Sequence, residues 1–211
     1  MIIVDIETAG INAKRSSILS IGAIDFSNPE RQFYEECYIW PDTEEVQEEA
    51  LSINGFTREQ IRDKTKKSPK QIMEEFLQWM EDAEEKTIAG ENPHFDRDFL
   101  KATAEKAHIP IIFPYRMVDL HSVCYAHHLK RGIQTPLKDK RTDLSLKKTF
   151  PYVGLPEEPL PHNALTGAKM EAEAFSRIIY GKNILVEFES YPIPDYLKQE
   201  NGKNKEYKGK R

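Results

Sequence analysis

The chain has 211 residues, with 30 Lys+Arg against 35 Asp+Glu, and therefore a formal net charge of −5. This length fits a single domain of about 100–200 residues with a short extension, and the hydrophobic content of 39% is that of a globular protein, not a disordered one. The sequence has no apolar run of about 18 residues, which excludes a transmembrane helix. We expect one domain over residues 1–197 and a flexible basic tail over residues 198–211.

The N-terminal residues lack the charged lead and the long apolar core of a signal peptide. Cys37 and Cys124 are too few to form a disulfide framework. We therefore expect a cytoplasmic protein with reduced thiols and no membrane partner.

The charge is unevenly distributed along the chain. Residues 35–91 carry 16 acidic and 7 basic groups, a net of −9, whereas residues 97–150 carry 5 and 11, a net of +6. The tail from residue 198 carries 2 acidic and 6 basic groups, a net of +4. The acidic total argues weakly against a nucleic-acid partner, but the basic middle segment is suited to holding phosphate.

The chain opens with three predicted strands. Ile2 to Ile6 form a short apolar run that suits a buried strand. Two further strands are expected at residues 18–26 and 33–40, joined as a hairpin by the turn at residues 27–29.

Three predicted helices follow. Residues 50–55 read as a short helix closed by Gly55. Thr57 and Ser68 are each followed three residues later by Gln, the pattern that opens a helix. The helix after Ser68 is amphipathic, with Ile72, Phe76, Leu77 and Met80 on one side.

The second half of the chain alternates strands with helices. Short strands are expected at residues 87–90 and 116–119. A helix is expected after the turn at residues 92–93, with Phe95, Phe99, Leu100 and Ala104 on its apolar stripe. Further helices are expected at about residues 120–130 and 163–180. Three consecutive strands followed by this alternation favour a mixed α/β sheet.

Asp5 and Glu7 stand at the end of the first predicted strand. Residues i and i+2 of a strand project to the same side, so the two carboxylates would lie next to each other. A divalent cation with oxygen ligands relieves their repulsion. The alternative is a strand end with two solvated acids, and the pair alone does not decide between them.

Asp96 and His162 are two further candidates. Asp96 falls near the start of a predicted helix, where the helix dipole favours a carboxylate even without a catalytic role. His162 directly precedes the last helix. A histidine with a pKa near the working pH can act as a general base, although a single histidine is more often structural or simply exposed.

Together these residues resemble the DEDDh branch of the DEDD superfamily of 3′–5′ exonucleases. Residues 5–10 (DIETAG) resemble its first motif, D-x-E-T-x-G, and residues 92–96 (NPHFD) its second, N-x-x-F-D. Residues 162–165 (HNAL) resemble the start of its third, H-x-A-L-x-D-A. Within the branch, residues 7–14 and 49–57 are similar to ribonuclease T and the proofreading-exonuclease-like proteins. The resemblance extends over most of the chain, up to the end of the last predicted helix.

The resemblance implies a ribonuclease H-like fold, with three α/β/α layers around a mixed sheet of roughly five strands. It also implies a two-metal phosphodiesterase. Asp5, Glu7 and Asp96 would hold two Mg²⁺ or Mn²⁺ ions, and His162 would take the proton from the attacking water.

The same resemblance implies a set of substrate-binding residues: Thr8, Ala9, Gly10, Ile11, Asn92 and Phe95. The small residues after Glu7 would let the backbone approach the terminal nucleotide closely. Ile11 stands where relatives place an apolar or aromatic side chain, and an aliphatic group can wedge against bases but cannot stack on them. The implied partner is the 3′ end of single-stranded DNA or RNA.

Position 167 departs from the family pattern. The third motif has Asp five residues after its His, as the fourth metal-binding carboxylate, whereas this chain has Gly167. The change either weakened the metal site, or marks a protein that lost catalysis, or is compensated by another acid such as Glu171. Glu171 lies one helical turn further on, and about 5.4 Å is a long distance for a ligand to be displaced. We therefore expect weakened binding of the second ion, and a many-fold gain in Mn²⁺-dependent activity when Asp is restored.

Two functions are consistent with these features. The first is a 3′–5′ exonuclease acting on single-stranded nucleic acid, impaired or inactivated by Gly167. The second is a catalytically dead nuclease-fold protein that binds nucleic acid or a polymerase-type partner. The retained carboxylates and His162 favour the first, because clustered carboxylates are costly to keep in a folded protein. Ribonuclease T-like proteins work as homodimers, so the resemblance also implies a homodimer.

Overall fold

The computed structural model describes residues 1–113 and 115–198, so the predicted basic tail, apart from Lys198, lies outside the described residues. The strands are β1 (Ile2–Thr8), β2 (Ile18–Asp25), β3 (Gln32–Glu36), β4 (Ile88–Gly90), β5 (Val118–Asp119), β6 (Leu137–Lys138) and β7 (Arg141–Thr142). The helices are α1 (Glu48–Asn54), α2 (Pro69–Glu81), α3 (His94–Lys106), α4 (Leu120–Lys130), α5 (Leu146–Tyr152) and α6 (Ala164–Tyr180), with 3-10 helices η1 (Gln60–Arg62) and η2 (Val186–Phe188).

Five strands form one mixed sheet in the order β3-β2-β1-β4-β5. β1 pairs antiparallel with β2, and β2 antiparallel with β3, whereas β4 pairs parallel with β1 and with β5. The predicted mixed sheet is therefore confirmed. The short β6-β7 hairpin is separate from this sheet.

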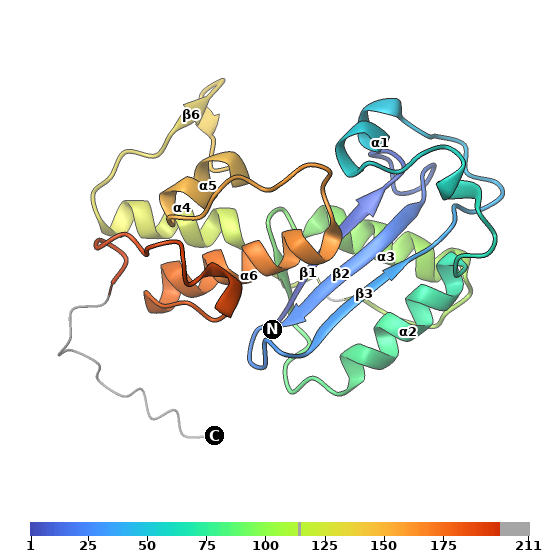
Figure 1. Cartoon of the computed structure of the whole chain (residues 1–211), viewed down its shortest axis with the longest axis horizontal. Helices are drawn as coiled ribbons and strands as arrows, with labels where there is room; N and C mark the ends of the chain where they lie inside the picture. The colour runs from blue at the N-terminus through green and yellow to red at the C-terminus, as the bar shows by residue number, and fades with distance from the viewer. Residues whose placement is uncertain (114, 199–211) are drawn as a thin grey trace.

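Helices cover both faces of the sheet, as expected for three layers (Figure 1). Alternation along β1 sets the two faces: Ile2, Val4 and Ile6 pack in the core that includes side chains of α2 and α3. Ile3 belongs to the opposite core, with side chains of α4, α5 and α6. Because Asp5 and Glu7 share the parity of Ile3, they face α6.

Gly22 lets the first turn of α6 lie directly on β2. Gly22 is paired with Asp5 in the β1-β2 register. A Cβ atom at Gly22 would lie 2.1 Å from the Ala164 carbonyl carbon, a distance that no side chain could tolerate. This close approach brings the start of α6 next to the carboxylates of β1.

The predicted helix starts are confirmed at two places and fail at a third. Ser68 caps α2 with a reciprocal Ser-Gln capping box, and the Asn163 side chain accepts hydrogen bonds from the first N–H groups of α6. The same reciprocal contact forms between Thr57 and Gln60, but only the short η1 follows it. The segment after Thr57 lacks the sustained apolar periodicity of α2, so its cap alone does not extend a helix.

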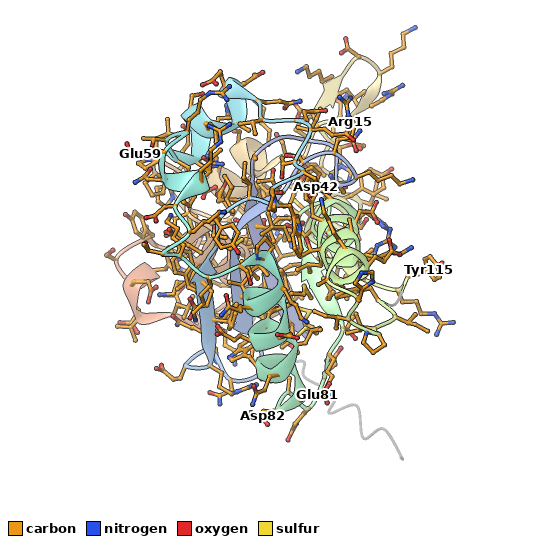
Figure 2. All side chains as sticks on the ribbon, turned by 90° about the vertical axis from the view of Figure 1, so that its right-hand side faces the viewer. Arg15, Asp42, Glu59, Glu81, Asp82 and Tyr115 are labelled. Atoms are coloured by element: carbon orange, nitrogen blue, oxygen red, sulfur yellow. The ribbon has the colours of Figure 1, made fainter. Side chains whose placement is uncertain are left out.

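Much of the acidic segment is solvated surface. Figure 2 shows charged side chains over the face that carries α2, with Glu81 and Asp82 near one end and Asp42 and Arg15 toward the other. Several of these acids are paired locally, for example Glu36 with Lys66 at 2.6 Å.

Cys37 and Cys124 are free and buried, which agrees with the expected reduced thiols. In the part of the chain that the structure describes, none of the helices is long and apolar enough to cross a membrane.

Candidate active site

Five acidic residues from four segments gather where β1 meets α6. Asp5 and Glu7 come from β1, and both are half-buried. Asp96, in the first turn of α3, is only 5% exposed, and Glu171 of α6 is 4% exposed. Glu158, in the loop before α6, has a side chain that is 10% exposed. The structure therefore brings together the three predicted metal ligands and adds two further acids.

Two of these carboxylates, those of Asp5 and Glu158, lie close to Gly167 of α6. A Cβ atom at Gly167 would lie 2.0 Å from Asp5 Oδ2 and 3.5 Å from Glu158 Oε1. The two oxygens thus approach one small volume above the helix. Asp5 already occupies the space into which an Asp at position 167 would project.

The Glu171 carboxylate lies next to Gly90, at the end of β4. A Cβ atom at Gly90 would lie 3.0 Å from both Glu171 Oε2 and the Val4 carbonyl oxygen. The same Oε2 accepts a hydrogen bond from the backbone N–H of Glu91 at 3.2 Å. The Glu171 carboxylate therefore lies over the junction of β1 and β4, close to Asp5.

The five carboxylates make no ion pair with any Lys or Arg in residues 1–113 and 115–198. Their one contact with a basic group joins Glu158 to His162. Burial, with the neighbouring negative charges adding to it, raises the pKa of Glu7 to about 7 and raises that of Asp5 strongly. Burial likewise raises the pKa of Asp96 to about 8 and that of Glu158 to about 7. The cluster resists full ionisation unless a cation joins it.

Because these neighbouring carboxylates repel each other when ionised, we expect the metal-free protein to lose stability as the pH rises. An acid with a raised folded-state pKa stabilises the fold most below its unfolded pKa of about 4.3, and that contribution is lost as the pH rises through its folded pKa. For Glu7 and Glu158 the loss extends from about pH 4.3 to about pH 7 and is nearly complete above pH 7. We expect the Tm in EDTA to fall by about 5 °C or more between pH 5.5 and pH 8.5, measured by calorimetry.

The control for this effect is Glu158→Gln. It removes one raised-pKa group without changing side-chain size, so its Tm should depend less steeply on pH. A Tm that rises over the same pH range would show that the carboxylates are already compensated in the metal-free protein.

His162 lies at the edge of the cluster. Its Nδ1 is 3.6 Å from Glu158 Oε2, and its side chain is 34% exposed. Burial, followed by the positive charge of Lys147, lowers the pKa of His162 below its usual range, which keeps the imidazole neutral at pH 7. The backbone N–H of His162 donates to the Ile53 carbonyl at 2.9 Å, so α1 holds this loop in place. A neutral, accessible imidazole next to carboxylates is able to accept a proton.

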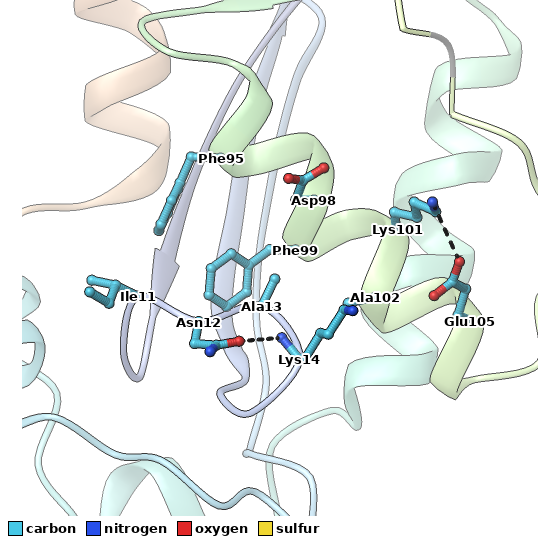
Figure 3. Close-up of a pocket in the computed structure, with 10 residues that line it drawn as sticks. All are labelled: Ile11, Asn12, Ala13, Lys14, Phe95, Asp98, Phe99, Lys101, Ala102 and Glu105. Carbon is cyan, nitrogen blue, oxygen red and sulfur yellow. Dashed lines mark hydrogen bonds and ion pairs between the residues drawn. The ribbon is translucent and has the colours of Figure 1, made fainter.

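A hollow of about 570 Å³ lies between the loop after β1 and α3 (Figure 3). Ile11, which is 72% exposed, and Phe95 line one end of it, and Lys14 and Lys101 line the other. The predicted substrate residues Ile11 and Phe95 therefore share one concave surface with apolar and cationic groups.

The other predicted substrate residues have visible structural roles. The buried Thr8 hydroxyl donates to the Gly10 carbonyl at 2.8 Å, which shapes the turn after β1, and Ala9 is fully buried. Asn92 has a φ of 50° and its carbonyl accepts from Phe95 N–H, so it forms the turn into α3. These residues place the backbone around the cluster.

Two residues of the site were not found from the sequence. Asn54, buried at the end of α1, donates to the Thr8 carbonyl at 3.0 Å. Its side chain also hydrogen bonds Glu7, which offsets part of the rise that burial causes in the pKa of that carboxyl. Glu158 lies in a loop without periodicity. For Asn54, the only available sequence signal was the resemblance of residues 49–57 to the family segment.

The donor chemistry fits Mg²⁺ or Mn²⁺, because all five groups are carboxylates and these cations prefer oxygen ligands. Glu158 Oε1 is buried without a hydrogen-bond partner, which also fits a cation at this place. As the side chains stand, no three Asp, Glu, His or Cys groups in the described chain form a ready-made set of metal ligands.

Comparisons with known proteins identify the family of this chain. Residues 2–175 match the family model of the RNase T exonucleases. The chain belongs to this exonuclease family, which confirms the resemblance to the DEDDh-type 3′–5′ exonucleases.

Individual relatives match over part of their length. The 3′-5′ DNA exonuclease Cap18 of Escherichia coli is 32% identical over 101 residues, which are 46% of this chain and 52% of Cap18. Cell-death related nuclease 4 superposes with a TM-score of 0.65 at 17% identity, covering 86% of this chain and 64% of that one. E. coli exonuclease I in complex with a dA16 oligonucleotide has a TM-score of 0.65 at 18% identity, covering 85% and 41%. These solved structures establish the ribonuclease H-like fold, and the chain spans about half the length of the curated relative.

Proposed function

We propose that this chain is a metal-dependent 3′–5′ exonuclease that removes nucleotides from the 3′ end of single-stranded nucleic acid. The observation that carries the proposal is the convergence of Asp5, Glu7 and Asp96 near His162, which lines a hollow together with Glu7. Family membership supports the same reaction class, and the exonuclease I complexes with oligonucleotides support a single-stranded substrate.

The residues of the site have different roles in phosphodiester hydrolysis. Asp5, Glu7 and Asp96 would hold two Mg²⁺ or Mn²⁺ ions, which supply an activated water and stabilise the leaving 3′ oxygen. His162 takes the proton from the attacking water at its ring nitrogen. Ile11 and Phe95 contact the terminal bases, and Lys14 balances phosphate charge.

The test uses single-stranded DNA and RNA oligonucleotides labelled at either end, with Mg²⁺ or Mn²⁺. We expect 5′-labelled strands to shorten stepwise, and 3′-labelled strands to release a labelled mononucleotide first. Binding of the strand without any degradation would contradict the proposal and favour the catalytically dead binder. The homodimer, the polymerase-type partner and the cytoplasmic location stay predictions.

A further inference from the structure

Glu171 is an acid that the family pattern does not require. It lies on the same face of α6 as Gly167, one turn toward the C-terminus. Its side chain is buried, and an acid so deep in a protein is rare unless something compensates its charge. The single hydrogen bond to the Glu91 N–H engages only Oε2. That hydrogen bond leaves the other oxygen, Oε1, to be accounted for.

Glu171 reaches the same volume as the predicted metal ligands. Side chains on a helix lean toward its N-terminus, so Glu171 covers the turn that contains Gly167. Its Oε2 lies 3.0 Å from the Cβ position of Gly90, as does the carbonyl oxygen of Val4, the residue that precedes Asp5. Glu171 therefore lies beside the strand segment that carries Asp5.

Gly167 is what makes this arrangement fit. With any side chain at position 167, the Cβ atom would lie 2.0 Å from Asp5 Oδ2 and 2.9 Å from Asp5 Cγ. Asp5 and a side chain at position 167 therefore exclude each other. The glycine allows Asp5 to lean over α6, and a longer acid from the next turn can join it.

A second observation at this place points to a bound cation. Glu158 Oε1 is buried, has no hydrogen-bond partner, and lies 3.5 Å from the Cβ position of Gly167. Its side chain is 10% exposed and is directed into the acid cluster. A buried carboxylate oxygen without a hydrogen-bond partner, among other carboxylates, destabilises the folded state. A bound cation would provide the missing partner.

We propose that Glu171 supplies the fourth metal-binding carboxylate, and that Gly167 is the residue that makes room for this relocated ligand. The inference rests on the proposed metal-dependent function. It replaces the view of Gly167 as a damaged site with that of a complete site whose fourth acid comes from the next helical turn.

The test measures Mn²⁺ binding to the full chain without substrate, by calorimetry and by electron paramagnetic resonance. Glu171→Gln keeps the size of the side chain and can still accept from the Glu91 N–H. We expect it to bind Mn²⁺ at least about tenfold more weakly, since even residues that only orient a metal ligand have effects of this size. Glu157→Gln, an exposed neutralisation nearby, is the matched control and should bind like the parent.

Glu171→Asp separates a ligand from a mere negative charge. This variant keeps the negative charge but shortens the side chain. If Glu171 is a direct ligand, Glu171→Asp should bind Mn²⁺ more weakly than the parent; if its role is purely electrostatic, the Mn²⁺ affinity should not change. Parent-like Mn²⁺ affinity in both Glu171 variants overturns the inference. So does a loss confined to Glu158→Gln, which would place the fourth ligand in the loop.

The outcome for the parent distinguishes this inference from the proposed function. If the parent binds Mn²⁺ and degrades single strands while the Glu171 variants bind normally, only the inference fails. If the parent neither binds Mn²⁺ nor degrades strands, both fail. Circular dichroism of each metal-free variant verifies folding, and Glu171→Gln should be no less stable at pH 8 because it removes one of the crowded charges.

Discussion

Replacing Asp96 with Asn should lower kcat by at least about 10³-fold, equivalent to about 4 kcal/mol of transition-state stabilisation. Asn has the same shape as Asp but carries no charge to hold a divalent cation. Asp96 lies in the first turn of α3 and is only 5% exposed, so no solvated acid can take its place. A labelled single-strand degradation assay under saturating Mn²⁺ measures the loss.

The same substitution should change stability in the opposite direction. Burial raises the pKa of Asp96 to about 8, so ionising this group opposes folding at neutral pH. Asp96→Asn should therefore melt at the same temperature as the metal-free parent or higher at pH 8. Asp82→Asn is the matched control, because Asp82 is exposed at the end of α2 (Figure 2) and should change neither property. Activity of Asp96→Asn within tenfold of the parent would remove Asp96 from the metal site.

The sheet and much of the site could be predicted because they follow local rules. The apolar alternation of β1 fixes which face each residue occupies, and so places Asp5 and Glu7 on the same side as Ile3. The Asn163 cap marks the start of α6, and with it the position of His162. In both cases the spacing along the chain settles the geometry.

Glu158 and Glu171 could not be placed in this way. Glu158 meets the cluster because α6 crosses β2 at Gly22, a packing contact between segments far apart in sequence. From the sequence alone Glu171 is a distant substitute, because one helical turn along the axis separates it from position 167. Helical side chains lean toward the N-terminus of the helix, and Gly167 has no side chain to block that direction. The Glu171 carboxylate therefore lies nearer to position 167 than its backbone position suggests.

Gly167→Asp is therefore expected to lower activity by about a hundredfold, or roughly 2.7 kcal/mol, not to restore it. The many-fold gain expected from the family pattern assumes an open space at position 167. In the structure that space holds the Asp5 carboxylate, 2.0 Å from where the new Cβ would lie. Asp5 would have to turn away, and the added charge would join a cluster that has no Lys or Arg ion-pair partner among the described residues. The degradation assay and Mn²⁺ affinity both report the loss.

Gly167→Ala distinguishes displacement from a missing ligand, because it adds the Cβ atom without a carboxylate. If Gly167 makes room for Asp5, Ala and Asp should both lower activity, although Ala should stabilise α6 by up to about 1 kcal/mol through its helix propensity. The atom displaced is the end of a flexible side chain, so the fold should tolerate either change while the site does not. If Gly167 is instead a lost ligand, Asp should raise activity and Ala should leave it nearly unchanged. The sign of the Asp effect, with Ala as reference, thus decides whether the glycine is a defect of this active site or part of its construction.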